Sequence, residues 1–207
     1  INIPAKVVSG DFYNFSDLGN NKYGFGVADV SGKGIKSSLL MSKASSLYRC
    51  LSKTIFSSSS LLKILNDEIC ETTTRGMFVT MIVGVYDKNK NELLLSNAGH
   101  EPPLIFSKDG NFKTIDEAGP PLGIAPNFKF TEQIISFKES SMYIFTDGIT
   151  EMKNNNGEML GQEGFQDYIK KYQSTPNNKR LQKMIEDLIS SGSCLLYTSD
   201  AADESDR

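Results

Sequence analysis

Three aspartates stand where an apolar run of the sequence gives way to glycine-rich chain: Asp11, Asp29 and Asp147. Asp11 follows a glycine, Asp147 precedes one, and Asp29 lies three residues before Gly32. A carboxylate at the end of a strand, with small residues beside it, can approach a divalent cation that a bulky neighbour would shield. Carboxylate oxygens are also the ligands that hard divalent cations prefer. The three positions therefore predict a metal site.

Each of these aspartates would also fit an ordinary turn, because Asp tolerates unusual backbone angles and hydrogen-bonds to its own chain. The flanking sequence favours the metal site. Residues 23–30 and 142–145 are β-branched, aromatic and apolar, as expected of strands buried in a sheet. We therefore expect rigid elements to present Asp29 and Asp147.

The short motif Gly32-Lys33-Gly34 could be mistaken for a phosphate-binding loop. It lacks the spacing and the closing Ser or Thr of a Walker motif. We expect these glycines to let the chain turn tightly after Asp29 and to leave the carbonyl of Val30 open as a further oxygen ligand.

Composition excludes several classes of function. The chain has 207 residues and a net charge of −3, with 22 basic and 25 acidic side chains well mixed, which argues against nucleic acid as a partner. No apolar run approaches the ~20 residues that cross a bilayer, so no membrane contact is expected. Three widely spaced cysteines and a single histidine argue against a zinc site or a disulfide framework and favour the reducing cytoplasm.

The hydrophobic period predicts the elements that would position the aspartates. Strands are expected in two hairpins at 12–30 and 77–97, a third at 103–115, and single runs at 128–137 and 141–145. Helices are expected at 35–55, from a cap at Ser59 or Ser60 to Ile69, and at 163–172 and 179–189. Strands joined in hairpins, with helices before and after them, predict an α+β fold with antiparallel sheets.

The two ends of the sequence predict a fragment. It begins without an initiator methionine, and residues 1–8 have the pattern of a strand. Residues 194–207 match the translation of a common sequencing adaptor. We therefore expect one domain at 1–193, incomplete at both ends, followed by a tail at 194–207 that is not native.

Five motifs in fixed order give the chain a resemblance to a known family. They are SGDFY (9–13), DVSGKG (29–34), NAGH (97–100), GPPLGI (119–124) and TDGITE (146–151). Across residues 4–192 the sequence resembles the SpoIIE-like branch of the bacterial type-2C, PPM-type protein phosphatases. The resemblance implies a sandwich of two antiparallel β-sheets flanked by α-helices.

The same resemblance implies the site and the reaction. Asp29 would bridge two Mn²⁺ or Mg²⁺ ions, Asp11 would bind one of them and Asp147 the other, with the Val30 carbonyl as a further ligand. The enzyme would hydrolyse phosphoserine or phosphothreonine on a regulatory protein, using a water activated by the two metals. The implied substrate is a phosphorylated anti-anti-sigma factor, with a sensor or dimerisation domain upstream in the parent protein.

The sequence departs from the family pattern in two places. Val30-Ser31 replace the Gly-His pair of the eukaryotic members, so the acid for the leaving group is not identified. The family's last strand, which carries a further metal-binding aspartate, is missing, so this chain is expected to be impaired. We expect His100 to serve only the turn in which it stands.

Two other functions stay open from the residues. The first is a catalytically impaired, phosphatase-like module that binds a phosphoprotein without turning it over. The second is a calcium-binding or structural domain, although the spacing of an EF-hand loop is absent. A homodimer is also expected, formed by the helices after Gly34 through outer faces that carry Leu40, Tyr48 and Phe56.

Overall fold

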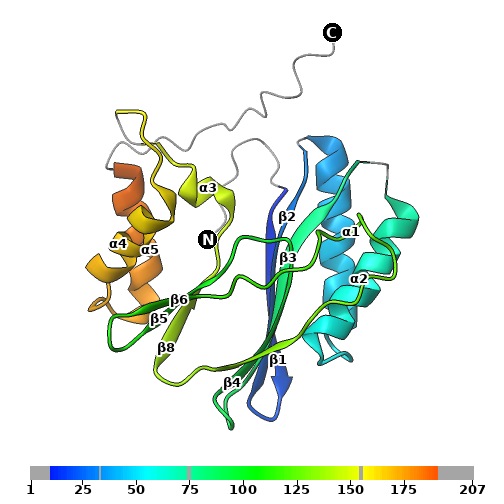
Figure 1. The fold of residues 1–207 in the computed structure, drawn as a ribbon, viewed down its shortest axis with the longest axis horizontal. Helices are drawn as coiled ribbons and strands as arrows, with labels where there is room; N and C mark the ends of the chain where they lie inside the picture. The colour runs from blue at the N-terminus through cyan, green and yellow to red at the C-terminus, as the bar shows by residue number, and fades with distance from the viewer. Residues whose placement is uncertain (1–9, 33, 74–75, 154–155, 191–207) are drawn as a thin grey trace. The chain divides into compact units, whose positions relative to one another are not determined.

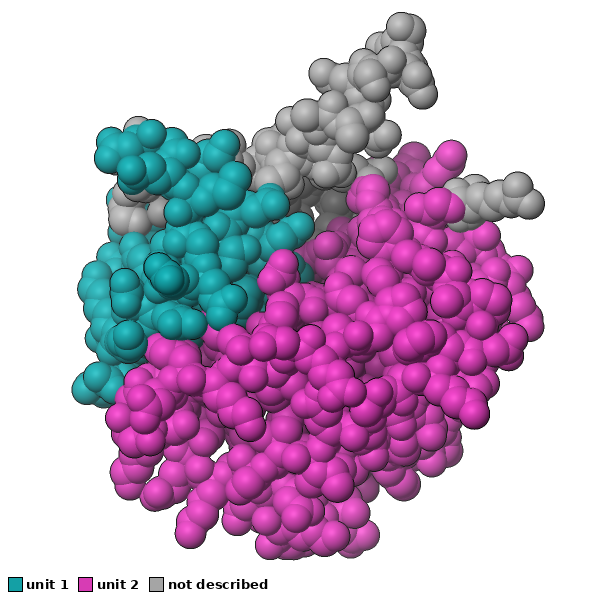
Figure 2. Space-filling view, viewed as in Figure 1, with its two compact units in different colours: residues 1, 3, 145–207 teal, residues 2, 4–144 magenta. Residues whose placement is uncertain are grey.

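The computed structural model describes residues 10–32, 34–73, 76–153 and 156–190 (Figure 1). These residues form two compact units, 10–144 and 145–190, which are described separately (Figure 2). The strand expected at 1–8 and the tail at 194–207 lie outside the described residues, as does Lys33.

The first unit contains two sheets in which all strand pairs are antiparallel. The five-stranded sheet has the order β1-β2-β3-β4-β7, with β1 at Phe12–Gly19, β2 at Lys22–Val30, β3 at Val79–Asp87, β4 at Glu92–Ala98 and β7 at Gln133–Ser136. The three-stranded sheet has the order β6-β5-β8, with β5 at Leu104–Ser107, β6 at Phe112–Thr114 and β8 at Ser140–Tyr143. The predicted α+β fold with antiparallel sheets is confirmed.

Two helices cover one face of the five-stranded sheet (Figure 1): α1 at Ile35–Leu51 and α2 at Ser58–Thr72. The even-numbered residues 24–30 of β2 are buried on this face. The Tyr48 ring of α1 lies 2.9 Å from the place where a side chain at Gly26 would begin, so the glycine lets the helix approach closely. Burial also raises the pKa of the Tyr48 hydroxyl.

This packing corrects the expected dimer surface. Leu40 is 7% exposed and Tyr48 is 1% exposed, so both belong to the core between α1 and the sheet. Of the three side chains expected on the outer faces, Phe56 alone is exposed. The 3.6-residue period identified an apolar stripe correctly but did not say which side of the helix faces the sheet.

The N-terminus of α2 is held by a carboxylate from the segment before β7. Glu132 Oε2 accepts hydrogen bonds from the backbone N–H of Ser58 at 2.7 Å and from the hydroxyls of Ser58 at 2.9 Å and Ser57 at 3.1 Å. The N-cap is Ser57, whose hydroxyl accepts from the Ser60 N–H at 3.3 Å; the predicted cap at Ser59 or Ser60 is wrong. An acidic group at this end satisfies donors that the helix leaves open.

Two predicted elements are shorter than expected. The strand predicted at 128–137 is confined to β7, because Phe128 and Phe130 pack edge to face, 5.0 Å apart, against the core under α1 and α2. The helix predicted to reach Ile55 ends at Leu51, where the N–H of Ser52 caps it by donating to Tyr48.

The second unit is helical, with α3 at Asp147–Thr150, α4 at Gly161–Lys171 and α5 at Asn177–Ser190. The salt bridge between Lys171 and Asp187, 2.6 Å long, joins α4 to α5. These two helices match the predictions at 163–172 and 179–189, whereas α3 was not predicted. In the described part of the chain no helix is long and apolar enough to cross a membrane.

Candidate metal centre

Asp29 is the penultimate residue of β2, and the hairpin brings Asp11 to the same place. Phe12 pairs with Ala28 as the last pair of the β1-β2 ladder, so the register, continued by one residue, sets Asp11 opposite Asp29. Residues that oppose each other on antiparallel strands project from the same face of the sheet. Both aspartates are half-buried, at one end of the sheet and on the face opposite to α1.

Gly10 borders this end of the sheet without a side chain. A Cβ atom at Gly10 would lie 3.1 Å from the carbonyl oxygen of Val30 and 3.6 Å from Oδ1 of Asp29. The backbone beside Asp11 therefore runs against a carboxylate oxygen and a carbonyl oxygen, which are two ligand types that Mg²⁺ and Mn²⁺ accept. The missing side chain leaves space next to both oxygens.

The turn after Asp29 is fixed to the start of β3. The backbone N–H of Ser31 donates to the carbonyl of Phe78 at 3.0 Å, and the N–H of Phe78 donates to Oγ of Ser31 at 2.8 Å. Gly32 and Gly34 have φ angles of 80° and 84°, a region that favours glycine. The tight turn expected after Asp29 is therefore present, and it holds the Val30 carbonyl in place.

Asp147 belongs to the second unit. It is exposed and is the first residue of α3, where its carbonyl accepts from the N–H of Glu151 at 2.8 Å. The structure thus brings Asp11, Asp29 and the Val30 carbonyl together in one unit and places Asp147 in the other. Among residues 10–32, 34–73, 76–153 and 156–190, no three His, Cys, Asp or Glu side chains form a group that could hold a metal ion.

His100 lies near the same strand end, in a turn after β4. Its backbone N–H donates to Oδ1 of Asn97 at 2.8 Å, and Nδ2 of Asn97 donates to the His100 carbonyl at 2.9 Å. This agrees with the turn expected there. The His100 ring contacts Thr80, the residue that pairs with Asp29 across β2 and β3. Thr80 was not predicted as part of the site, because the register between β2 and β3 cannot be read from the sequence.

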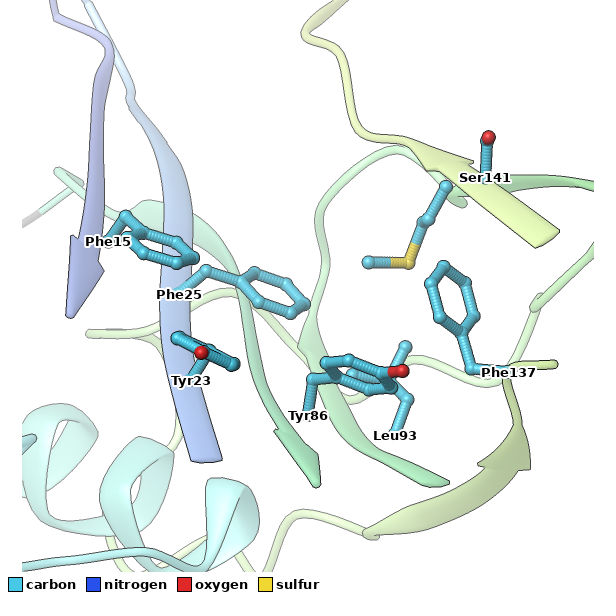
Figure 3. Close-up of a pocket in the computed structure, with 8 residues that line it drawn as sticks. Phe15, Tyr23, Phe25, Tyr86, Leu93, Phe137 and Ser141 are labelled. Atoms are coloured by element: carbon cyan, nitrogen blue, oxygen red, sulfur yellow. The ribbon is translucent and has the colours of Figure 1, made fainter. Parts of the chain in front are cut away.

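An apolar pocket of about 410 Å³ lies on the same face of the sheet (Figure 3). Phe25, which lines it, is four residues along β2 from Asp29, or about 13 Å at ~3.3 Å per residue. The lining residues are Phe15, Tyr23, Phe25, Tyr86, Leu93, Phe137, Ser141 and Met142. Because none of them carries a charge, this pocket does not suit a divalent cation.

We expect Gly10→Val to weaken Mn²⁺ binding by about tenfold, because the new side chain would crowd the Val30 carbonyl and the Asp29 carboxylate. Overpacking of this kind typically costs about 1–3 kcal/mol. Isothermal titration calorimetry with MnCl₂ measures the change. Gly10→Ala adds only the Cβ atom and should have a smaller effect. Equal affinity in the valine variant and the unmodified chain would contradict the placement of the site.

The sequence matches the family model described as Stage II sporulation protein E (SpoIIE) over residues 19–203. It is also 30% identical over 191 residues to the phosphoserine phosphatase RsbU of Bacillus subtilis (strain 168), a match that covers 91% of this chain and 56% of that protein. Three curated relatives are covered over only 56%, 30% and 37% of their own length. The family match includes most of the tail at 194–207, whose adaptor origin stays a prediction.

Solved structures show the same fold. The SiaA-PP2C domain of Pseudomonas aeruginosa superposes with a TM-score of 0.80 at 16% identity, covering 91% of this chain and 76% of that one. A crystal structure of RsbX in complex with magnesium superposes with a TM-score of 0.70 at 15% identity, covering 94% of this chain and 86% of that one. At these identities the likeness establishes the fold alone.

Proposed function

The chain belongs to the SpoIIE family, and from this membership we propose that it is a metal-dependent protein phosphatase that hydrolyses phosphoserine or phosphothreonine on a regulatory protein. One observation carries the proposal. Asp11, Asp29 and the Val30 carbonyl meet at one strand end, where Gly10 leaves space beside them.

The donor set suits a hard divalent cation. Two carboxylates opposite each other on neighbouring strands repel each other, and a cation between them would relieve that repulsion. A set of carboxylate and carbonyl oxygens without nitrogen or sulfur suits Mn²⁺ and Mg²⁺ better than zinc, which most often includes His or Cys among its ligands. The RsbX structure with magnesium is further support. We therefore propose two Mn²⁺ or Mg²⁺ ions as the cofactors.

Each residue has a separate task in this proposal. From the family resemblance, Asp29 would contribute to both ions, Asp11 to one and Asp147 to the other. The contacts between Ser31 and Phe78 would keep the Val30 carbonyl directed at the site. The bound ions would lower the pKa of a water molecule and neutralise charge on the phosphoryl group during in-line attack.

The proposal also includes the substrate, the cellular compartment and the other domains of the parent protein. The similarity to the phosphoserine phosphatase RsbU supports a phosphoserine protein as substrate, and the family resemblance suggests an anti-anti-sigma factor in the cytoplasm. The chain covers little more than half of RsbU, so a sensor or dimerisation domain elsewhere in the parent protein fits the proposal.

We expect the chain to release inorganic phosphate from a phosphoserine protein in the presence of MnCl₂, at the reduced rate already expected from its sequence, and to leave a phosphotyrosine protein intact. Malachite-green detection of phosphate, with intact-mass analysis of both proteins, measures the two reactions. Binding of the phosphoserine protein without phosphate release would instead support the non-catalytic module. Equal release from both substrates would contradict selectivity for phosphoserine.

A further inference from the structure

We propose that His100 and Thr80 act together as positioning residues that hold Asp29 where it binds metal, an inference that rests on the proposed function. Neither residue is among the carboxylates and carbonyls assigned to the cations. Both lie in the unit that contains Asp29, and the contacts between them are direct.

Thr80 provides the first step. It pairs with Asp29 across β2 and β3, so the two side chains project from the same face of the sheet. The Thr80 hydroxyl also donates to the backbone carbonyl of Asp29 at 3.4 Å. It is therefore tied to the strand residue that carries the candidate ligand.

His100 provides the second step. Its Nδ1 lies 3.0 Å from Oγ1 of Thr80. A threonine hydroxyl has one hydrogen to donate. If that hydrogen goes to the Asp29 carbonyl, Nδ1 of His100 must carry the proton and donate to Thr80. With this tautomer, a path of hydrogen bonds runs from His100 through Thr80 to the backbone carbonyl of Asp29.

The position of the imidazole is fixed independently of this path. His100 is 4% exposed, and Asn97 clamps its backbone on both sides. Gly99, with φ at 68°, lies under Pro121, whose ring atoms come within 2.7 Å of the place where a side chain would begin. A buried imidazole costs free energy that a turn alone does not require. A role in directing Thr80 explains why this turn carries a histidine.

Outer residues that orient metal ligands typically change metal affinity or activity by 10–100-fold when they are replaced. We expect His100→Leu and Thr80→Val each to lower Mn²⁺ affinity and kcat by about tenfold or more. Because both changes break the same path, the double variant should lose little beyond either single variant. His100→Asn places an amide N–H near the position of Nδ1 and should recover most of the loss, as should Thr80→Ser.

Calorimetry with MnCl₂, phosphate release from a phosphoserine protein and chemical unfolding of the metal-free chain are measured for every variant. Glu132→Ala is the matched control, because it weakens the start of α2 on the opposite face of the sheet and should lower stability without changing Mn²⁺ affinity. If His100→Leu and Thr80→Val behave like this control, the positioning role is wrong. Additive losses in the double variant would also overturn it.

The same measurements separate this inference from the proposed function. An unmodified chain that binds Mn²⁺ but releases no phosphate would reject the phosphatase, while the Mn²⁺ affinities of the variants would still decide the role of His100. An unmodified chain that binds no Mn²⁺ would overturn the positioning role together with the metal site.

Discussion

Asp29→Asn is expected to reduce phosphate release by about a thousandfold or more while the fold stays intact. As a ligand of the proposed ions, Asp29 would support their stabilisation of charge in the reaction, an effect of several kcal/mol, and each 1.36 kcal/mol corresponds to a tenfold change in rate. The assay is kcat/KM for a phosphoserine protein at saturating MnCl₂. Asp116→Asn removes the same charge from an exposed position of the same unit and serves as the control.

Thermal unfolding provides a second test of Asp29→Asn, in which the metal-free variant should not lose stability although it loses activity. Without metal the variant should be as stable as the unmodified chain or more stable, because the repulsion between Asp29 and Asp11 is removed. With Mn²⁺ the unmodified chain should gain stability and the variant should not. A variant that unfolds at lower temperature without metal would show that Asp29 supports the fold and would weaken its assignment as a ligand.

Removal of divalent cations has the second large expected effect, because the proposed reaction depends on them throughout. Treatment with EDTA should abolish phosphate release, and added Mn²⁺ or Mg²⁺ should restore it. Separate titrations of the two ions will show which is preferred. Activity that persists after exhaustive chelation would rule out the proposed mechanism, whatever residues are involved.

Removal of the divalent cations should also lower the thermal stability of the chain, which can be measured without substrate. A ligand at 100 times its Kd stabilises the folded state by about 2.7 kcal/mol, which for a chain of this size raises Tm by roughly 5–10 °C. Differential scanning calorimetry with and without MnCl₂ measures the shift. The Gly10→Val variant should show a smaller increase in Tm at the same Mn²⁺ concentration, because its affinity for Mn²⁺ is expected to be lower.

The part of the site that depends on local sequence could be predicted. A hairpin joined by a short polar turn fixes its own register, so Asp11 and Asp29 could be placed at one strand end from the sequence. Thr80 lies beyond two helices, 51 residues after Asp29, and its pairing with Asp29 depends on how β2 and β3 meet. The contact with His100 depends on that pairing, and the sequence therefore suggested no more than a turn.

For the fold as well, local sequence predicted the elements but not the contacts between distant elements. Alternation of apolar and polar residues located the strands, because each strand has one buried face. It could not show that Phe128 and Phe130 leave the sheet for the core beneath the helices, since aromatic residues suit both places. Tyr48 can be buried because Gly26 of β2 leaves room for its ring. The spacing of apolar residues along a helix cannot predict such a contact between a helix and a strand.

The contact between Glu132 and the start of α2 has a consequence for how the sequence can change. One carboxylate oxygen accepts from Ser57, Ser58 and Ser59, so its loss leaves donors of three successive residues unsatisfied at once. Substitutions at Glu132 and at Ser57 or Ser58 should therefore be strongly non-additive. A homologue that replaces Glu132 should also carry changes at the start of α2. We therefore expect the segment before β7 and the start of α2 to vary together among homologues.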